Sequence, residues 1–445
     1  MSMSSMRVFV GIDLGSTTTK AIVLGEDGAV IGRGITNSRS NYSVACGIAR
    51  EEAFVRARFT LTRQALSANP ALAGTEKSFL SSLERNFRFQ QHLSQLTRLQ
   101  QAILAGATGP RYVRFKPELD AVLERIHAAM VERALIHFGE LAVRKSDFFR
   151  DLAAADYMHL AEQHSDPKGI SFETLCGLFD AAILVVENEA VADAFQSHIA
   201  KALDRTLAQA PLALKEKIES LRAAVESVRS MEFLETASVG TGYGRQRLPF
   251  PKEQIRSEIL CHGLGAHAMF PETRTVLDIG GQDTKAIQVD SQGIVTSFQM
   301  NDRCAAGCGR YLGYIADEMS LGLHELGPLA QQSTCRVKIN STCTVFAGAE
   351  LRERLSLGEA REDILAGLHR AMILRAMSLL ARSGGIADQF TFTGGVARNP
   401  AAVAALNELV KENYGQRTLN ISADSIYTGA LGAALFALRS VEKVH

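Results

Sequence analysis

A short pattern occurs twice in this chain, and the repeat limits its fold more than any other feature of the sequence. Residues 276–285 read V-L-D-I-G-G-Q-D-T-K, and residues 10–20 read V-G-I-D-L-G-S-T-T-T-K. With the two aspartates aligned, the match continues without a gap as far as Gly28 and Gly293. An internal repeat says more about architecture than a single motif does. The chain is therefore expected to contain two copies of one structural unit.

Each copy of the repeat is predicted to form a β-hairpin. The first pairs strands at Val8–Ile12 and Lys20–Leu24, and the second pairs strands at Thr275–Ile279 and Lys285–Val289. Both hairpins have apolar strands joined by a turn of small residues. The turns E-D-G and S-Q-G then lead to a third strand in each copy.

The residues at each hairpin turn suit phosphate binding. Both copies read D-x-G-x-x-x-T-K, with Asp13 and Asp278 at the ends of their first strands. Glycines let backbone N–H groups approach phosphate oxygens, hydroxyl groups add donors, and a carboxylate can hold a magnesium ion through water. Two ordinary surface hairpins are the simpler alternative, but two matching copies in register favour a polyphosphate held from both sides.

Composition argues against several classes of protein. Lys and Arg equal Asp and Glu at 48 each among 445 residues, so no net field favours nucleic acid or an anionic membrane. The start, M-S-M-S-S-M-R, has one positive residue, and Asp13 interrupts the apolar run after it, so no signal peptide is expected. No stretch is expected to span a membrane. The seven cysteines then indicate metal or redox chemistry in a reducing cytoplasm.

The segment 42–235 differs in character from the parts that carry the repeat. It has few strand signals, and Lys116–Gly139 and Ala200–Phe233 show the spacing of amphipathic helices. We expect a mainly helical insertion there, either a docking surface or a cap that only buries its own core. Residues 1–41 would then begin the first lobe, and residues 236–445 would hold its remainder and the second lobe.

Further segments carry glycine or histidine near the expected nucleotide site. Ala237–Arg245 is interpreted as a glycine-rich loop after a short strand, and Glu253–Ala268 as a helix. His262 of that helix is interpreted as a partly buried histidine with satisfied hydrogen bonds, which is commoner than a ligand. Gln389–Thr393 is predicted to be a strand before G-G-V-A-R-N-P, where the double glycine lets the backbone approach a ribose or adenine.

The cysteines of the C-terminal half suggest a metal cluster. Cys304 and Cys343 each precede an expected helix, Ala305–Met319 and Thr344–Leu357. A thiolate at a helix N-terminus lies in positive potential, which favours an anionic centre such as an iron–sulfur cluster.

A [4Fe–4S] cluster needs four thiolates, and this region offers two ways to supply them. Cys304, Cys308, Cys335 and Cys343 could close one site within the chain. Alternatively, Cys304 and Cys343 could supply half of a site that a second subunit completes. The spacing alone leaves both arrangements open.

Taken together, the glycine-bearing turns resemble those of the actin-like (ASKHA) ATPase superfamily, an α/β fold with two duplicated ribonuclease H-like lobes. Six motifs narrow the resemblance to the BadF/BadG/BcrA/BcrD ATPase family: T-G-Y-G-R, E-I-L-C-H-G-L-G-A, D-I-G-G-Q-D-T-K, N-D-R-C-A-A-G-C-G-R-Y-L, S-T-C-T-V-F-A and T-G-G-V-A-R-N. The resemblance implies that ATP hydrolysis drives a low-potential electron from a [4Fe–4S] cluster held between two ATPase subunits. By motif, the two cysteines from each subunit fall on Cys304 and Cys343, which favours the shared site.

Two features depart from the compact activators of 2-hydroxyacyl-CoA dehydratases in that family. These are the long helical segment, and Cys308 where the activators carry threonine. Both features resemble the larger ATPase subunit of ATP-dependent benzoyl-CoA reductase. That resemblance implies partnership with a second ATPase subunit, two acyl-CoA-binding iron–sulfur subunits and reduced ferredoxin. A dehydratase activator is the alternative, and an actin-fold small-molecule kinase is the alternative from another class.

The family resemblance assigns roles to the residues of the repeat. Asp13 and Asp278 orient Mg²⁺ through water, and Lys20 offsets phosphate charge. Gln282 is predicted to place the attacking water, by analogy with other nucleotide hydrolases, with Asp283 as its rival. The residues expected to contact ATP or ADP are Gly15, Ser16, Thr17, Thr18, Lys20, Gly280, Gly281, Asp283, Gly394, Gly395 and Asn399.

Overall fold

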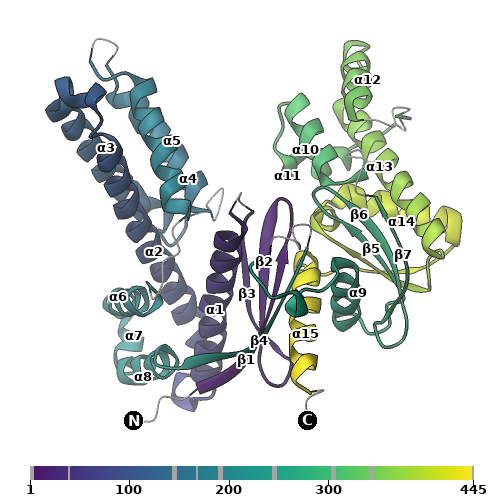
Figure 1. Ribbon diagram of the computed structural model, residues 1–445, viewed down its shortest axis with the longest axis horizontal. Coiled ribbons are helices and arrows are strands. Elements are labelled where there is room, and N and C mark those ends of the chain that lie inside the picture. The colour runs from purple at the N-terminus through teal and green to yellow at the C-terminus, as the bar shows by residue number, and fades with distance from the viewer. Residues whose placement is uncertain are drawn as a thin grey trace. The chain divides into compact units, whose positions relative to one another are not determined.

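The computed structural model describes residues 5–38, 41–142, 148–166, 169–188, 194–242, 248–301, 307–335, 337–339 and 344–442. The chain divides into two compact units. One contains Val55–Glu232 together with Met1–Met6, and the other contains Arg7–Phe54 and Phe233–His445. We call them the helical unit and the repeat unit. Figure 1 labels the elements of both.

The helical unit is built on one long helix, α2 (Glu76–Gly106). Its first half shares a buried cluster with residues such as Leu203 and Leu221, and its second half shares another with Leu123 and Phe179. Every element described between residues 42 and 229 is helical, as the amphipathic spacing predicts. The other helices of this segment are α1 (Tyr42–Ser67), α3 (Lys116–His137), α4 (Phe149–His164), α5 (Phe172–Asn188), α6 (Ala194–Ala208), α7 (Leu212–Lys215) and α8 (Ile218–Arg229).

The repeat unit contains two sheets, one for each copy of the repeat. The first sheet has the strand order β3-β2-β1-β4 and the second has the order β7-β6-β5-β8-β9. The strands are β1 (Ser5–Leu14), β2 (Thr18–Leu24), β3 (Val30–Asn37), β4 (Glu232–Gly242), β5 (Thr275–Ile279), β6 (Thr284–Val289), β7 (Val295–Asn301), β8 (Gln389–Thr393) and β9 (Thr418–Asn420). The helices are α9 (Glu258–Met269), α10 (Gly309–Glu318), α11 (Leu323–Ala330), α12 (Thr344–Ser356), α13 (Arg361–Ser383), α14 (Pro400–Tyr414) and α15 (Thr428–Glu442).

The two hairpins match each other residue by residue, which confirms the predicted repeat. Asp13 pairs with Lys20 across the first hairpin, and Asp278 pairs with Lys285 across the second. The pairing of the second and third strands shifts at Val23/Leu24 in one copy and at Gln288/Val289 in the other, which are aligned positions. The glycines that open the third strands also agree, with φ of 75° at Gly28 and 77° at Gly293.

The duplication extends to a fourth strand that the repeat pattern does not include. β4 and β8 both lie beside the first strand of their hairpin, and a Thr-Gly pair marks the end of each, with Gly242 closing β4 and Gly394 directly following β8. Gly242 has φ 111° and Gly394 has φ 86°. A Cβ on Gly242 would collide with the Leu14 carbonyl, and one on Gly394 would collide with the Ile279 carbonyl. Only glycine fits this close approach at a positive φ.

Three local predictions are wrong. Ala237–Gly242 belongs to strand β4 because it pairs with the first hairpin, so it is not a glycine-rich loop. Helix α9 begins at Glu258 because Ile255 first forms a parallel bridge with Gly240. Helix α10 begins at Gly309 rather than Ala305 because Cys308 is extended, with φ −135° and ψ 177°.

Helix α13 meets the length and apolarity of a membrane span, contrary to the prediction that no stretch does. Its most apolar window is 61% buried within the structure. Leu368, Met372 and Leu380 of this helix lie in the main core beside the second sheet. Among the described residues, α13 thus has the environment of a core helix.

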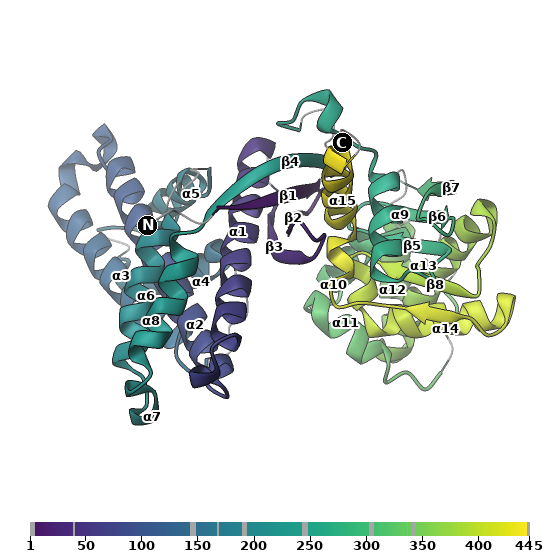
Figure 2. The same cartoon turned by 90° about the horizontal axis from the view of Figure 1, so that it is seen from below.

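Helices α9 and α15 cross each other between the two sheets. α9 packs on the second sheet, α15 packs on the first, and both views show this arrangement (Figures 1 and 2). A Cβ on Gly265 would collide with the Thr428 carbonyl, and one on Gly432 would collide with the Cys261 carbonyl. The contacts are reciprocal, because Cys261 and Gly265 are four positions apart on α9, as Thr428 and Gly432 are on α15. Two glycines therefore set how closely the helices cross.

We predict that Gly432→Ala destabilises the protein, because its new methyl group would meet backbone atoms of Cys261 that cannot move independently. Overpacking of this kind costs about 1–3 kcal/mol. Gly47→Ala is the matched control, since it also lies inside a helix and its Cβ would meet nothing within 4 Å. Urea unfolding of both variants measures the difference, and equal stabilities would contradict the crossing contact.

Candidate functional site

The site is centred on two buried carboxylates at the ends of matching strands. Asp13 near the end of β1 is 5% exposed, and Asp278 near the end of β5 is 1% exposed. Thr393 at the end of β8 donates a 2.8 Å hydrogen bond from Oγ1 to Oδ1 of Asp278. Burial alone would raise the pKa of Asp278, but His262 and Lys285 hold it well below its usual range. Asp278 is therefore a carboxylate at neutral pH.

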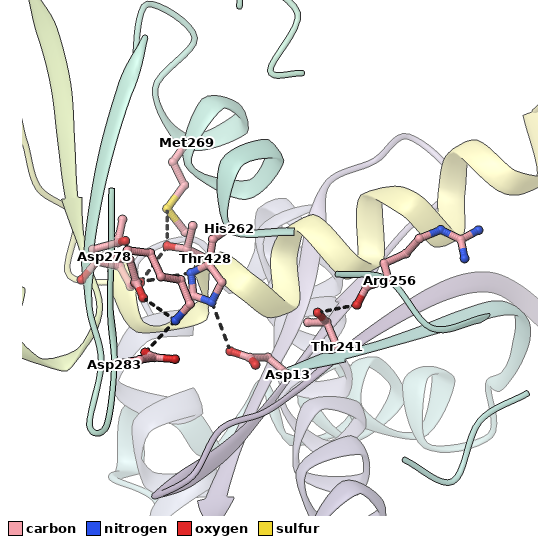
Figure 3. A network of polar contacts seen from close by, with 11 residues as sticks. Asp13, Thr241, Arg256, His262, Met269, Asp278, Asp283 and Thr428 are labelled. Carbon is pink, nitrogen blue, oxygen red and sulfur yellow. Dashed lines mark hydrogen bonds and ion pairs between the residues drawn. The ribbon is translucent and has the colours of Figure 1, made fainter. Parts of the chain in front are cut away.

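His262 of α9 lies between these two carboxylates, as Figure 3 shows. Its Nε2 is 3.9 Å from Oδ2 of Asp13, and its Nδ1 is 3.4 Å from Oδ1 of Asp278. The buried Nδ1 has no partner in hydrogen-bond geometry among the described residues. The prediction of a satisfied, partly buried histidine is therefore wrong. Burial lowers the pKa of His262, but Asp278 and Asp13 outweigh burial and raise it overall.

Room for this histidine comes from a glycine on the crossing helix. A Cβ on Gly429, in the first turn of α15, would lie 2.7 Å from Oδ2 of Asp13 and 2.8 Å from Nε2 of His262. In the reciprocal crossing of α9 and α15, Gly429 occupies the place on α15 that His262 occupies on α9. One helix supplies the imidazole, and the other leaves space for it.

The two aligned lysines differ in their partners. Lys285 is 3% exposed, with Nζ 2.7 Å from Oδ1 of Asp283 and 3.4 Å from Oδ2 of Asp278. In the first hairpin the position aligned with Asp283 is Thr18, so Lys20 has no such carboxylate. The structure shows no ion pair for Lys20 with any described residue, and its Nζ lies over the turn, 3.2 Å from where a Cβ on Gly15 would be. Of the two aligned lysines, Lys20 is thus the one without a carboxylate partner in the described part of the chain.

The pairing with Lys285 also bears on which residue places a water molecule. Asp283 is 9% exposed and engages Lys285, so its carboxylate is already used. Gln282 is half-buried in the turn and makes no hydrogen bond from its side chain to the residues described. Of the two predicted alternatives, the geometry favours Gln282.

The two predicted phosphate turns face each other closely. A Cβ on Gly281 would lie 2.6 Å from Oγ1 of Thr17 and 3.8 Å from Oγ of Ser16. The first turn is braced by Ser38, which donates from Oγ to the Gly15 carbonyl at 2.5 Å and from its N–H to the Thr17 carbonyl at 2.8 Å. The hydroxyls and glycines predicted to contact phosphates therefore lie in one place.

The second turn is hydrogen-bonded to the start of α10. The N–H groups of Gly309 and Arg310 donate to the carbonyls of Gly280 and Gly281, both at 2.8 Å. Thr284, at the start of β6, donates from Oγ1 to the Gly307 carbonyl at 2.5 Å. Three bonds thus join this turn and its strand to the segment that carries Cys308.

The predicted cluster ligands Cys304 and Cys343 lie outside the described residues. Cys308 is buried directly before α10, and Cys335 is exposed. Asp363 at the start of α13 accepts hydrogen bonds from the N–H groups of Thr334 and Cys335 and from Ser333 Oγ. Asp363 therefore holds the turn at Ser333–Cys335.

The double-glycine segment has one open position and one position with a structural role. A Cβ on Gly395 would meet nothing within 4 Å, so a ligand can approach its backbone. Asn399 instead caps α14, because its Oδ1 accepts from the N–H groups of Ala401 and Ala402. Its Nδ2 lies 3.0 Å from Nε2 of His369. The Asn399 side chain is thus engaged by protein, and its predicted contact with the nucleoside remains a prediction.

Known proteins place the chain in a family. A sequence model described as the BadF/BadG/BcrA/BcrD ATPase family matches residues 10–437. The (R)-2-hydroxyglutaryl-CoA dehydratase activating ATPase of Acidaminococcus fermentans is 43% identical over 206 residues, which cover 46% of this chain and 76% of that protein. One of the subunits of benzoyl-CoA reductase from Thauera aromatica is 30% identical over 246 residues, which cover 55% of this chain and 86% of that protein.

The solved structures agree with the architecture. The activator of 2-hydroxyisocaproyl-CoA dehydratase from Clostridium difficile, with bound ADPNP, superposes with a TM-score of 0.51 at 23% identity. That match covers 98% of this chain and 96% of that one. The predicted actin-like fold with duplicated α/β lobes is confirmed.

We predict opposite phenotypes for the two aligned lysines. Lys20→Met should leave stability almost unchanged and weaken ADPNP binding by about tenfold or more, because a charge-assisted hydrogen bond is lost. Lys285→Met should destabilise the fold by about 3–5 kcal/mol, because it leaves Asp278 and Asp283 buried without their cation. Calorimetric titration with ADPNP and urea unfolding measure the two effects. Identical behaviour of the two variants would contradict the asymmetry.

Proposed function

This chain belongs to the BadF/BadG/BcrA/BcrD ATPase family, and we propose that it is an ATP-hydrolysing activator that passes a low-potential electron to a 2-hydroxyacyl-CoA dehydratase. One observation supports the proposed coupling of ATP hydrolysis to electron transfer. The second phosphate turn is bonded through Gly280 and Gly281 to the first residues of α10. A change at the turn therefore acts directly on the segment that contains the cysteines.

ATP with magnesium is proposed to bind between the facing turns. Asp13 and Asp278 would orient the metal through water, and Lys20 would offset phosphate charge. Backbone N–H groups of the turns would hold the phosphates. The open backbone at Gly395 would face the nucleoside. Gln282 would orient the attacking water.

Hydrolysis removes the γ-phosphate that both turns would contact. The turns belong to different sheets, so they are free to separate once that shared contact is gone. The carbonyls of Gly280 and Gly281 would then move with the second turn and take the N–H groups of Gly309 and Arg310 with them. The nucleotide state would thereby be linked to the position of α10 directly, through these backbone hydrogen bonds.

The starts of α10 and α12 suit half of a [4Fe–4S] site. α12 begins at Thr344, immediately after Cys343, and α10 begins five residues after Cys304. Helix N-termini favour thiolates and an anionic centre. A cluster bound there would supply the one-electron redox centre. Cys304 and Cys343 would be its ligands from this chain, and a second ATPase subunit would supply the other two.

The comparisons favour a dehydratase as the electron acceptor. The Acidaminococcus relative named as a dehydratase activating ATPase is 43% identical, against 30% for the Thauera reductase protein. An ATPase subunit of benzoyl-CoA reductase is the second candidate, because the helical unit at 55–232 and Cys308 are the features that resemble its larger ATPase subunit. Reduced ferredoxin is the proposed donor in both cases.

Anaerobic reconstitution tests the proposed acceptor. The reduced chain, assembled with its second ATPase subunit, is mixed with ATP and either 2-hydroxyacyl-CoA dehydratase or the acyl-CoA-binding subunits of benzoyl-CoA reductase. We expect ATP-dependent dehydration of the hydroxyacyl-CoA in the first mixture. Ring reduction in the second mixture alone would establish the reductase as the acceptor, and ATP hydrolysis with neither product would refute both candidates.

We predict that Cys304→Ala and Cys343→Ala each abolish iron binding by the assembled ATPase pair, because a cluster without one thiolate is labile. Cys308→Ala and Cys335→Ala are the matched controls and should retain iron. Iron per assembled pair, measured anaerobically, distinguishes them. If the two controls lose iron as completely, the cluster lies within one chain and the shared site is wrong.

We predict that Thr284→Val uncouples the second turn from α10, because it removes the hydroxyl that holds Gly307. Hydrogen exchange at Gly309 and Arg310 should become faster and lose its dependence on ADPNP. Thr19→Val is the matched control, since Thr19 is the aligned residue and its hydroxyl contacts Ser38 instead. Equal exchange in the two variants would contradict the link.

A further inference from the structure

Glu258 opens α9 and is held in the site by strand β4. The Arg256 N–H donates to the Gly240 carbonyl at 3.0 Å, and Oγ1 of Thr241 donates to the Arg256 carbonyl at 2.9 Å (Figure 3). Thr241 is fully buried, so this link is shielded from water. The two bonds fix the chain two residues before Glu258 and determine where α9 begins.

The helix places Glu258 on the same face as His262. Residues four apart on a helix are neighbours on one face, and His262 lies between Asp13 and Asp278. The charges that act on Glu258 are, in order of effect, Lys285, Asp283, His262 and Asp13, all from the site. Glu258 and His262 therefore share the face of α9 that His262 turns toward Asp13 and Asp278.

Glu258 is buried but unused by the protein. It is 6% exposed, yet it makes no hydrogen bond or ion pair through its carboxylate with any residue that the structure describes. Some polar atoms of the described residues are shielded from solvent and lack a hydrogen-bond partner. The carboxylate oxygens of Glu258 are not among them. A carboxylate that is largely buried, reaches solvent and has no protein partner can accept hydrogen bonds from water or substrate instead.

The other carboxylates of the site are engaged. Asp283 binds Lys285, Asp278 binds Thr393 and Lys285, and Asp13 lies against His262. Gln282 can orient a water molecule but has no basic group to accept its proton. Burial raises the pKa of Glu258 above the usual carboxylate value despite the opposing charge of Lys285. A raised pKa makes a carboxylate a stronger base.

We propose that Glu258 is the general base for ATP hydrolysis, an assignment that rests on the proposed function. The oxygen of a water molecule bonds to the γ-phosphorus while the bond from that phosphorus to the β–γ bridging oxygen breaks. The electron pair of the broken bond stays on ADP. The proton lost by the water passes to the Glu258 carboxylate and then to solvent. Gln282 orients the same water.

The test compares Glu258→Gln with wild type in the full chain. The glutamine keeps the size of the side chain but cannot take the proton. We expect the kcat for ATP hydrolysis to fall by about 100-fold or more, in line with loss of a general base. The Kd for ADPNP should stay within about twofold, since the residue is not needed to hold the nucleotide. Glu272→Gln, at an exposed position just after α9, is the control and should match wild type in both measurements.

Two results would overturn the assignment. Hydrolysis by Glu258→Gln near the wild-type rate would show that no proton passes to this residue. Loss of ADPNP binding together with a lower melting temperature would show a structural role instead. Glu258→Asp separates these cases further, because a shortened base should retain part of the kcat at unchanged ADPNP affinity.

Failure of the proposed function gives a different result. A wild-type chain that hydrolyses ATP but activates neither acceptor refutes the electron-transfer proposal and leaves the Glu258 comparison intact. A wild-type chain that binds ADPNP but does not hydrolyse ATP refutes both.

Discussion

The rest of the site depends on two like charges that the duplicated hairpins bury close together. Asp13 and Asp278 end matching strands, and both are almost completely buried. Buried like charges repel strongly, and each needs a cation or donor to remain ionised. In the described part of the site, the cations and donors near these carboxylates are Lys285, Thr393 and His262, and they contact mainly Asp278. Among the same residues Asp13 has only His262 at 3.9 Å, so a further positive charge such as a magnesium ion would complete the arrangement.

The duplication gives both copies of the site the same backbone conformation. The aligned side chains differ in what they contact. The hairpin register, the shifted pairing and the positive-φ glycines agree in both lobes. Thr393 holds the carboxylate of Asp278, whereas the equivalent Thr241 holds the start of α9. Lys285 is neutralised by Asp283, whereas Lys20 has threonine at the aligned position. In both cases the second lobe ties its carboxylate or lysine to protein groups, and the aligned group of the first lobe lacks that contact among the described residues.

The sequence predicted what depends on local pattern and failed where distant segments meet. The repeat correctly predicted both hairpins, because an apolar strand, a glycine turn and a second strand are local signals. The start of α10 could not be predicted from the helical pattern, since the carbonyls of Gly280 and Gly281 capture the N–H groups of Gly309 and Arg310. The prediction for His262 was wrong because its neighbours come from two strands and a crossing helix. A Thr-Gly pair at the ends of β4 and β8 was the available signal for the fourth strand, but two residues are too short a match to align the copies.

The same duplication connects each predicted phosphate turn to a segment of a different kind. In both lobes the chain that leaves the third strand returns to its phosphate turn. Ser38 binds the carbonyls of Gly15 and Thr17 in the first lobe, just before α1 leads into the helical unit. In the second lobe the bonds at Gly280 and Gly281 hold the first two residues of α10, directly after Cys308. The helical unit and the cysteine segment therefore interrupt the two lobes at one topological point. A nucleotide held by both turns, as proposed, would contact the base of each insertion, so one hydrolysis event would act on both.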